Sequence, residues 1–106
     1  MAREPLKALT ESMFYVLLSL LGQERCGAEI VAFVDGLTAG RVPLGPGTLY
    51  TLLAKFQEEE LIQETAVEGR RRTYQITDQG RALFQQELER LRRCVEDGEV
   101  QLGVRN

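Results

Sequence analysis

The chain has 106 residues, the length of one domain, and 43% of them are hydrophobic while 27% are charged. This composition is typical of a globular domain with a modest core, and it excludes disordered and collagen-like chains. Thirteen basic residues against sixteen acidic ones give a net charge of −3. That balance, taken alone, disfavours non-specific binding to nucleic acid.

The sequence has no histidine, no tryptophan and two cysteines, Cys26 and Cys94. Without histidine, Ser-His-Asp and Cys-His nucleophile systems are excluded, as is every zinc site that needs imidazole. Two separated thiols cannot complete a four-ligand zinc site, so we expect no metal and no cofactor. We expect both cysteines to be free packing residues in a reducing compartment. No apolar stretch is long enough to cross a bilayer, which predicts a cytoplasmic protein with no membrane partner.

The first predicted helix follows an N-terminal arm over residues 1–9. Thr10 is the expected N-cap, and Gly22 is expected to follow the last turn. The apolar run over residues 13–21 favours a helix because leucine dominates it. A buried strand is the alternative, since so short a run does not fix its period.

Two amphipathic helices are expected next, over residues 27–37 and 48–60. The connection over residues 38–47 contains three glycines and two prolines, which indicates constrained turns. Apolar residues recur at helical spacing in both helices and form one stripe in each. The stripes consist of Ile30, Phe33, Val34 and Leu37 in the first and of Leu49, Leu52, Leu53 and Phe56 in the second.

A change of period after the third helix predicts a β-hairpin. The expected strands are residues 61–65 and 72–76, and residues 66–71 form the turn. Thr77 is then the expected N-cap of a last helix. That helix carries apolar residues spaced four, three and four apart, typical of a dimer seam, although the helix could instead fold back on its own domain. The seam residues are Phe84, Leu88, Leu91 and Val95.

The element order is that of a winged helix, a helix-turn-helix variant with a hairpin as its wing. We therefore predict a mainly α fold with a small β-hairpin (α+β), followed by a C-terminal dimerisation helix. The expected parts are a DNA-binding domain over residues 1–80, the dimerisation helix over 81–97, ended by Gly98, and a loose tail over 98–106.

The charge is unevenly distributed along the chain. No acidic residue occurs between Arg41 and Gln57, and Arg70, Arg71 and Arg72 stand in the expected hairpin turn. The third helix and the wing are the elements that approach DNA in a winged helix, so both are suited to phosphate contact. The glutamate run at residues 58–60 is interpreted as a solvated helix end that points away from DNA.

The segment LGPGTLYTLLAKFQEEELI, residues 44–62, resembles the signature of PadR-type transcriptional regulators. The similarity extends over roughly residues 9–97, including LTESMFYVLLSLL upstream and RRRTYQITDQGRALF downstream. The resemblance implies a bacterial DNA-binding repressor that acts as a homodimer through its C-terminal helix. It also implies a response to phenolic or other small hydrophobic compounds, and control of efflux or detoxification genes.

The resemblance assigns Thr48, Tyr50 and Lys55 to the DNA-facing side of the third helix, and the three arginines to backbone contacts. Arg41 and Thr51 join this set by their place in the acid-free segment. The face is short of Arg, Asn and Gln, so we expect specificity to depend partly on DNA shape. An effector pocket is expected between the first and last helices, near Phe14, Tyr15 and Phe84.

The sequence departs from the family pattern in three ways. The second helix usually opens His-Gly-Tyr-Glu, whereas residues 26–29 here are Cys-Gly-Ala-Glu, so that Cys26 and Ala28 replace the histidine and the aromatic residue. Glu60 occupies a position that is usually glycine, and a left-handed backbone there would be strained. The absence of tryptophan excludes the stacking of flat drugs on that residue, which some members use.

The predicted function is sequence-specific transcriptional regulation, with a pseudo-palindromic double-stranded operator bound by a homodimer. The alternative is a protein–protein docking module, in which the arginines grip an acidic partner. An enzyme is not expected, because the chain has no histidine and no phosphate-binding loop; Gly45-Pro46-Gly47 lacks the Gly-Lys-Ser/Thr ending.

Overall fold

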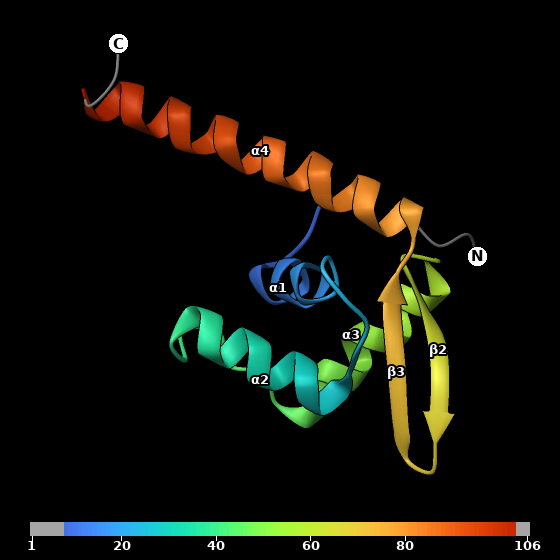
Figure 1. Cartoon of the computed structure of the whole chain (residues 1–106). Coiled ribbons are helices and arrows are strands. Elements are labelled where there is room, and N and C mark those ends of the chain that lie inside the picture. The colour runs from blue at the N-terminus through green and yellow to red at the C-terminus, as the bar shows by residue number, and fades with distance from the viewer. Residues whose placement is uncertain (1–7, 104–106) are drawn as a thin grey trace.

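The computed structural model describes residues 8–103, and it contains four helices and one small antiparallel sheet (Figure 1). This architecture confirms the α+β winged helix. Most of the expected N-terminal arm lies outside the described residues. The elements are α1 (Glu11–Ser19), β1 (Arg25–Cys26), α2 (Gly27–Thr38), α3 (Pro46–Glu58), β2 (Ile62–Glu68), β3 (Arg71–Ile76) and α4 (Asp78–Leu102).

Helix α1 confirms the helical interpretation of the apolar run and of Thr10 as its cap, whose hydroxyl accepts a hydrogen bond from the Met13 amide. The expected end at Gly22 is wrong, because the helix stops at Ser19. The amides of Leu20 and Leu21 donate hydrogen bonds to the carbonyls three residues earlier, which tightens the last turn. The freed Ser19 carbonyl accepts from Arg25 Nε at 2.6 Å.

A short strand, β1, stands between the first two helices, where no strand was expected from the sequence. It pairs antiparallel with β3, so that Arg25 lies opposite Tyr74, and the sheet order is β1-β3-β2. Two residues have no detectable period, so the sequence alone could not reveal this strand. Helix α2 follows at once and agrees with the expected range, although Leu37 of its predicted stripe is 55% exposed.

Helix α3 begins at Pro46 rather than Thr48, with Gly45 as its N-cap. Proline suits the first position of a helix because its missing N–H has no partner there in any case. At the other end, the Leu61 amide bonds to the Phe56 carbonyl at 2.8 Å and the Glu60 amide to the Gln57 carbonyl at 3.1 Å. This is a Schellman motif, in which the residue after the cap adopts the left-handed conformation.

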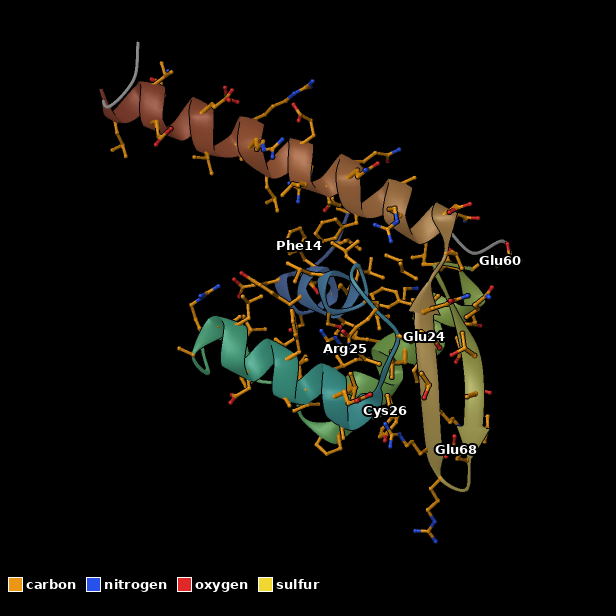
Figure 2. The ribbon with its side chains drawn as sticks, viewed as in Figure 1. Phe14, Glu24, Arg25, Cys26, Glu60 and Glu68 are labelled. Atoms are coloured by element: carbon orange, nitrogen blue, oxygen red, sulfur yellow. The ribbon has the colours of Figure 1, made fainter. Side chains whose placement is uncertain are left out.

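Glu60, labelled in Figure 2, is that left-handed residue, with φ of 61°. A side chain in this region costs about 1 kcal/mol relative to glycine. We therefore expect Glu60→Gly to raise the free energy of unfolding by about 1 kcal/mol, measured by urea denaturation. Glu68→Gly, on the exposed strand β2, is the control and should lower it by about 0.5–1 kcal/mol, as glycine does inside a strand. Loss of stability at both positions would contradict the assignment of strain to Glu60.

The hairpin is longer than expected, and its turn is shorter. Strands β2 and β3 extend to Glu68 and from Arg71, so only Gly69 and Arg70 remain in the turn instead of residues 66–71. A two-residue hairpin turn needs positive φ, and Gly69 supplies it at 62°. A register irregularity follows Glu64, where the ladder skips one residue of β2. Because the two strands are paired almost to the tip of the hairpin, the wing (residues 62–76) projects as a long ribbon (Figure 1).

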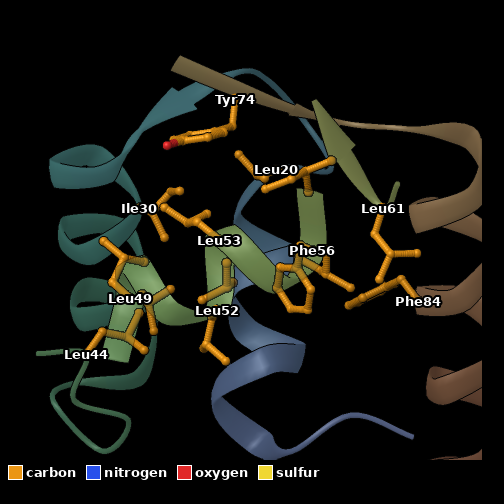
Figure 3. Close-up of a cluster of buried hydrophobic side chains, with 14 of the residues drawn as sticks. Leu20, Ile30, Leu44, Leu49, Leu52, Leu53, Phe56, Leu61, Tyr74 and Phe84 are labelled. Atoms are coloured by element: carbon orange, nitrogen blue, oxygen red, sulfur yellow. The ribbon is translucent and has the colours of Figure 1, made fainter. Parts of the chain in front are cut away.

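The hydrophobic core lies between α1, α2, α3 and the base of the sheet (Figure 3). The predicted stripe of α3 is confirmed, since all four of its members are buried. Phe56 is fully buried within this cluster. This core fixes one face of α3 and leaves the opposite face to solvent.

The first half of α4 packs on α1. The Phe84 ring stacks on Phe14, with centroids 4.6 Å apart, and is 5% exposed. The buried Glu87 carboxylate accepts from the Leu9 amide at 2.7 Å and from Arg90 Nε at 2.8 Å. The Arg90 hydrogen bond lowers the pKa of Glu87, and the Leu9 amide also lowers it, against the effect of burial. The ionised Glu87 carboxylate therefore stabilises the folded protein above the ordinary glutamate pKa. That contribution is lost as the pH falls through the lowered pKa of Glu87 in the folded protein.

The second half of α4 extends away from the rest of the domain (Figure 1). The expected end at Gly98, and with it the loose tail from residue 98, is wrong: the helix continues to Leu102 and ends at Gly103, with φ of 82°. One internal glycine costs only about 1 kcal/mol relative to alanine, which its helix-forming neighbours can tolerate. Within residues 8–103, no helix combines the length and apolarity needed to cross a bilayer.

Candidate nucleic-acid interface

The solvent-exposed face of α3 carries the side chains that the sequence assigned to DNA. Thr48, Tyr50, Thr51 and Ala54 are exposed and Lys55 is half-buried, opposite the stripe that enters the core. We call these five residues the recognition face. Tyr50 is 58% exposed, so that its side chain can be contacted from solvent.

A groove of about 880 Å³ lies between the recognition face, the start of α2 and the wing. Tyr50 borders it and lies over Gly27, since a Cβ on that glycine would stand 3.5 Å from the Tyr50 hydroxyl. The structure thus brings Tyr50 together with the three wing arginines in one groove, whereas Thr48, Thr51 and Lys55 do not line it. The lining residues are Cys26, Gly27, Ala28, Glu29, Tyr50, Leu53, Ala54, Gln57, Arg70, Arg71, Arg72 and Tyr74.

A second, shallower hollow follows α3 on the side of Thr51 and Lys55. Glu58 also lines it, because it stands three residues after Lys55 and seven after Thr51 on the same side of the helix. The interpretation of the whole glutamate run as pointing away is therefore wrong for Glu58. One carboxylate borders the surface that the sequence indicated to be free of acid.

Two of the three wing arginines are paired with carboxylates. Arg72 Nη1 lies 3.0 Å from Glu64 Oε2, and Arg71 Nη2 lies 3.6 Å from Glu29 Oε1. The hydrogen bond to Glu64 raises the pKa of Arg72. The pKa of Glu29 is lowered, most of all by the hydrogen bond from the Cys26 backbone amide. The Cys26 side chain and the charge of Arg71 lower this pKa further. Among residues 8–103, Arg70 at the tip of the wing is left without such a partner.

Arg41 lines neither hollow. Its Nη2 donates to the Tyr15 hydroxyl at 2.8 Å, which ties it to α1. The three rings of the expected effector pocket lie together, because Phe14 contacts Tyr15 edge-on at 5.5 Å and stacks on Phe84. The sequence placed Phe84 in the exposed seam, but in the structure it is a core residue of its own chain.

Two residues of the candidate interface were missed from the sequence, Gln57 and Glu29. Gln57 is exposed and lines the groove. It stands seven residues after Tyr50 and three after Ala54, a spacing that could have revealed it. The face was expected to be short of glutamine, and Gln57 is an exception to that expectation. Glu29 was noticed only as part of a motif, and its pairing with Arg71 has no signal in the sequence.

Cys26 is buried at the start of α2, whereas Cys94 is exposed on α4 and so does not pack within its own chain. Within the described part of the chain, no three His, Cys, Asp or Glu residues are grouped so that they could hold a metal ion.

A three-helix core with a hairpin wing and an exposed third-helix face defines a winged-helix protein. Residues 16–86 match the transcriptional regulator PadR-like family, and the chain belongs to that family. Its members are transcriptional regulators, a class of protein distinct from enzymes.

Solved structures share the fold. A transcriptional regulator from Clostridium thermocellum is 24% identical, with a TM-score of 0.73 over 80% of this chain and 84% of that one. A PadR family regulator from Clostridium difficile R20291 is 17% identical, with a TM-score of 0.71 over 88% and 98%. Bacillus subtilis PadR in complex with operator DNA is 20% identical, with a TM-score of 0.64 over 72% and 45%.

A curated relative is an uncharacterised 37.1 kDa protein in transposon TN4556 of Streptomyces fradiae. It is 30% identical over 83 residues, which are 78% of this chain and 24% of that protein. The chain thus spans about a quarter of the length of this relative.

Proposed function

We propose that the chain is a DNA-binding repressor whose recognition face enters the major groove of an operator while the wing lies along the neighbouring backbone. The observation that carries this proposal is the exposed helix face of Thr48, Tyr50, Thr51 and Lys55 beside Arg70, which has no carboxylate partner among residues 8–103. A major groove admits one α-helix, and phosphate contacts from basic side chains supply most of the affinity.

The proposed roles follow from side-chain chemistry. Lys55 and Arg70 contact phosphates as cations, and Thr48 at the start of α3 does so through its hydroxyl near the positive end of the helix. Tyr50, Thr51 and Gln57 face base edges, where a glutamine amide can pair with adenine and a threonine methyl can contact thymine.

A homodimer would present two such heads about 34 Å apart, one turn of DNA, to a pseudo-palindrome. The exposed seam of α4 supports this arrangement. Leu91 is 37% and Val95 58% exposed, and the same spacing continues through Gly98 to Leu102, which is 81% exposed. A second copy of the helix would remove these side chains from water.

We also place a site for a small hydrophobic effector at the contact between α1 and α4, beside Phe14 and Tyr15. This contact connects the DNA-binding domain to the helix that carries the seam. A ligand that parted the two helices would change the angle between the heads, provided that it bound one arrangement more tightly. Calorimetry with phenolic compounds, with and without operator, measures that difference in affinity.

The DNA-binding proposal is tested by gel shifts on fragments selected from the source genome by the protein itself. Tyr50→Ala and Lys55→Ala should each weaken operator binding by about tenfold or more, corresponding to 1–3 kcal/mol per good contact. Glu96→Ala, on the exposed part of α4, is the control and should bind normally. Unchanged binding by both recognition-face variants would refute the proposal, and capture of a protein with no DNA would favour the docking alternative.

A further inference from the structure

The wing carries its own competitors for DNA phosphate. Arg72 meets Glu64 on the neighbouring strand, and Arg71 meets Glu29 at the start of α2, across the groove. Each pair therefore joins a cation of the proposed DNA surface to a carboxylate of the same chain. A carboxylate presents two anionic oxygens to a guanidinium in nearly the way a phosphate does.

Both carboxylates are held in place by the fold. Glu29 Oε1 accepts a hydrogen bond from the Cys26 amide at 2.8 Å, which fixes it at the N-terminus of α2. Glu64 lies in β2 directly opposite Tyr74, and its side chain is only 25% exposed. Neither acid is a freely moving surface group, so each keeps its negative charge beside the wing.

The arginines, in contrast, can change partners. The side chains of Arg71 and Arg72 are 60% and 59% exposed, so phosphates can reach them from solvent. In the wild-type protein each carboxylate competes with phosphate for its arginine and also repels the approaching backbone. Exposed ion pairs contribute little stability, so removing the carboxylate charge frees the arginine for a phosphate at little cost to the fold.

We infer that Glu29 and Glu64 act as built-in phosphate surrogates that neutralise the wing in the free protein and lower its affinity for every duplex. The inference rests on the proposed DNA-binding function and concerns its strength rather than its sequence preference. Because phosphates carry no sequence information, the surrogates weaken operator and non-operator binding by the same factor. They limit how long the protein stays on any DNA, which suits a regulator that must leave its operator.

The test uses Glu29→Gln and Glu64→Gln, singly and together, with operator and scrambled duplexes over a range of salt. Glutamine keeps a hydrogen-bond acceptor, including for the cap of α2, so the fold should persist. We expect each variant to bind both duplexes about threefold more tightly and the double variant about tenfold. The slope of log affinity against log salt should steepen by about 0.9 for each arginine released to a phosphate.

Glu96→Gln is the matched control, because it removes the same charge from an exposed site on α4 and should change affinity by less than about 1.5-fold at physiological salt. Arg72→Gln adds a second measurement. In the wild-type protein it should reduce DNA affinity only slightly, whereas in the Glu64→Gln background it should remove the whole increase in affinity that Glu64→Gln produced. If the wild-type protein binds DNA and both Glu29→Gln and Glu64→Gln bind it with the same affinity, only this inference is overturned. No binding by the wild type or any variant overturns the proposed function as well.

Discussion

Gly80→Ala should destabilise the protein by about 3 kcal/mol, the cost of a clash in a packed interior that cannot relax. A Cβ at this position would stand 2.1 Å from the Leu61 carbonyl oxygen and 2.9 Å from Ile76 Cγ1. The oxygen cannot move freely, because it accepts a hydrogen bond from the Thr77 amide at 3.0 Å. Gly80 thus lets the first turn of α4 lie directly on the ends of β2 and β3.

Thermal and urea denaturation measure this effect, which should lower the melting temperature by roughly 10 °C or more. Gly36→Ala is the matched control, since that glycine also lies in a helix but has no atom within 4 Å of its added Cβ. It should stabilise the protein by about 0.5–1 kcal/mol through helix propensity alone. If the two variants have similar stabilities, the close approach at Gly80 is not rigid.

The elements that the sequence predicted well are those determined by local chemistry. The stripe of α3 follows from spacing within one helix, and Thr10 and Thr77 cap helices through bonds to amides three residues away. Neither feature depends on distant parts of the chain. The resemblance to PadR regulators then supplied the functional context, which periodicity alone does not contain.

The errors have the opposite origin, because they depend on contacts between distant segments. Strand β1 exists only because β3 pairs with it. Phe84 belongs to the seam by spacing, yet Phe14 on α1 covers it. Gly98 was expected to end the helix, but α4 continues past it and ends at Gly103, which adopts the left-handed conformation.

The candidate site shows the same division. The sequence identified most of the recognition face and the run of arginines, but it could not show which carboxylates the fold would bring to them. Glu29 and Arg71 lie far apart in the chain and meet across a groove. The apparent positive charge of the wing is therefore largely balanced in the folded protein, and Arg70 is its main unpaired cation among the described residues.

The proposed dimer makes the second large prediction. Leu91→Lys combined with Val95→Lys should convert the protein to a monomer in analytical ultracentrifugation, because four lysines would face one another across the two-fold seam. Operator affinity should then fall by about 100-fold or more, since a single head loses the high effective concentration that the second provides. Both residues are exposed in the single chain, so its helical circular dichroism should persist.

Val100→Lys is the control for this result, because it also replaces an exposed apolar residue of α4, 46% exposed in the single chain. It lies five residues after Val95, which turns it away from the seam on a helix of 3.6 residues per turn. That variant should remain dimeric and bind the operator normally. If Val100→Lys dissociates the protein as readily as the seam variant does, α4 associates through another face. If the seam variant stays dimeric, the exposed half of α4 has some other role, and the two heads must be held together elsewhere.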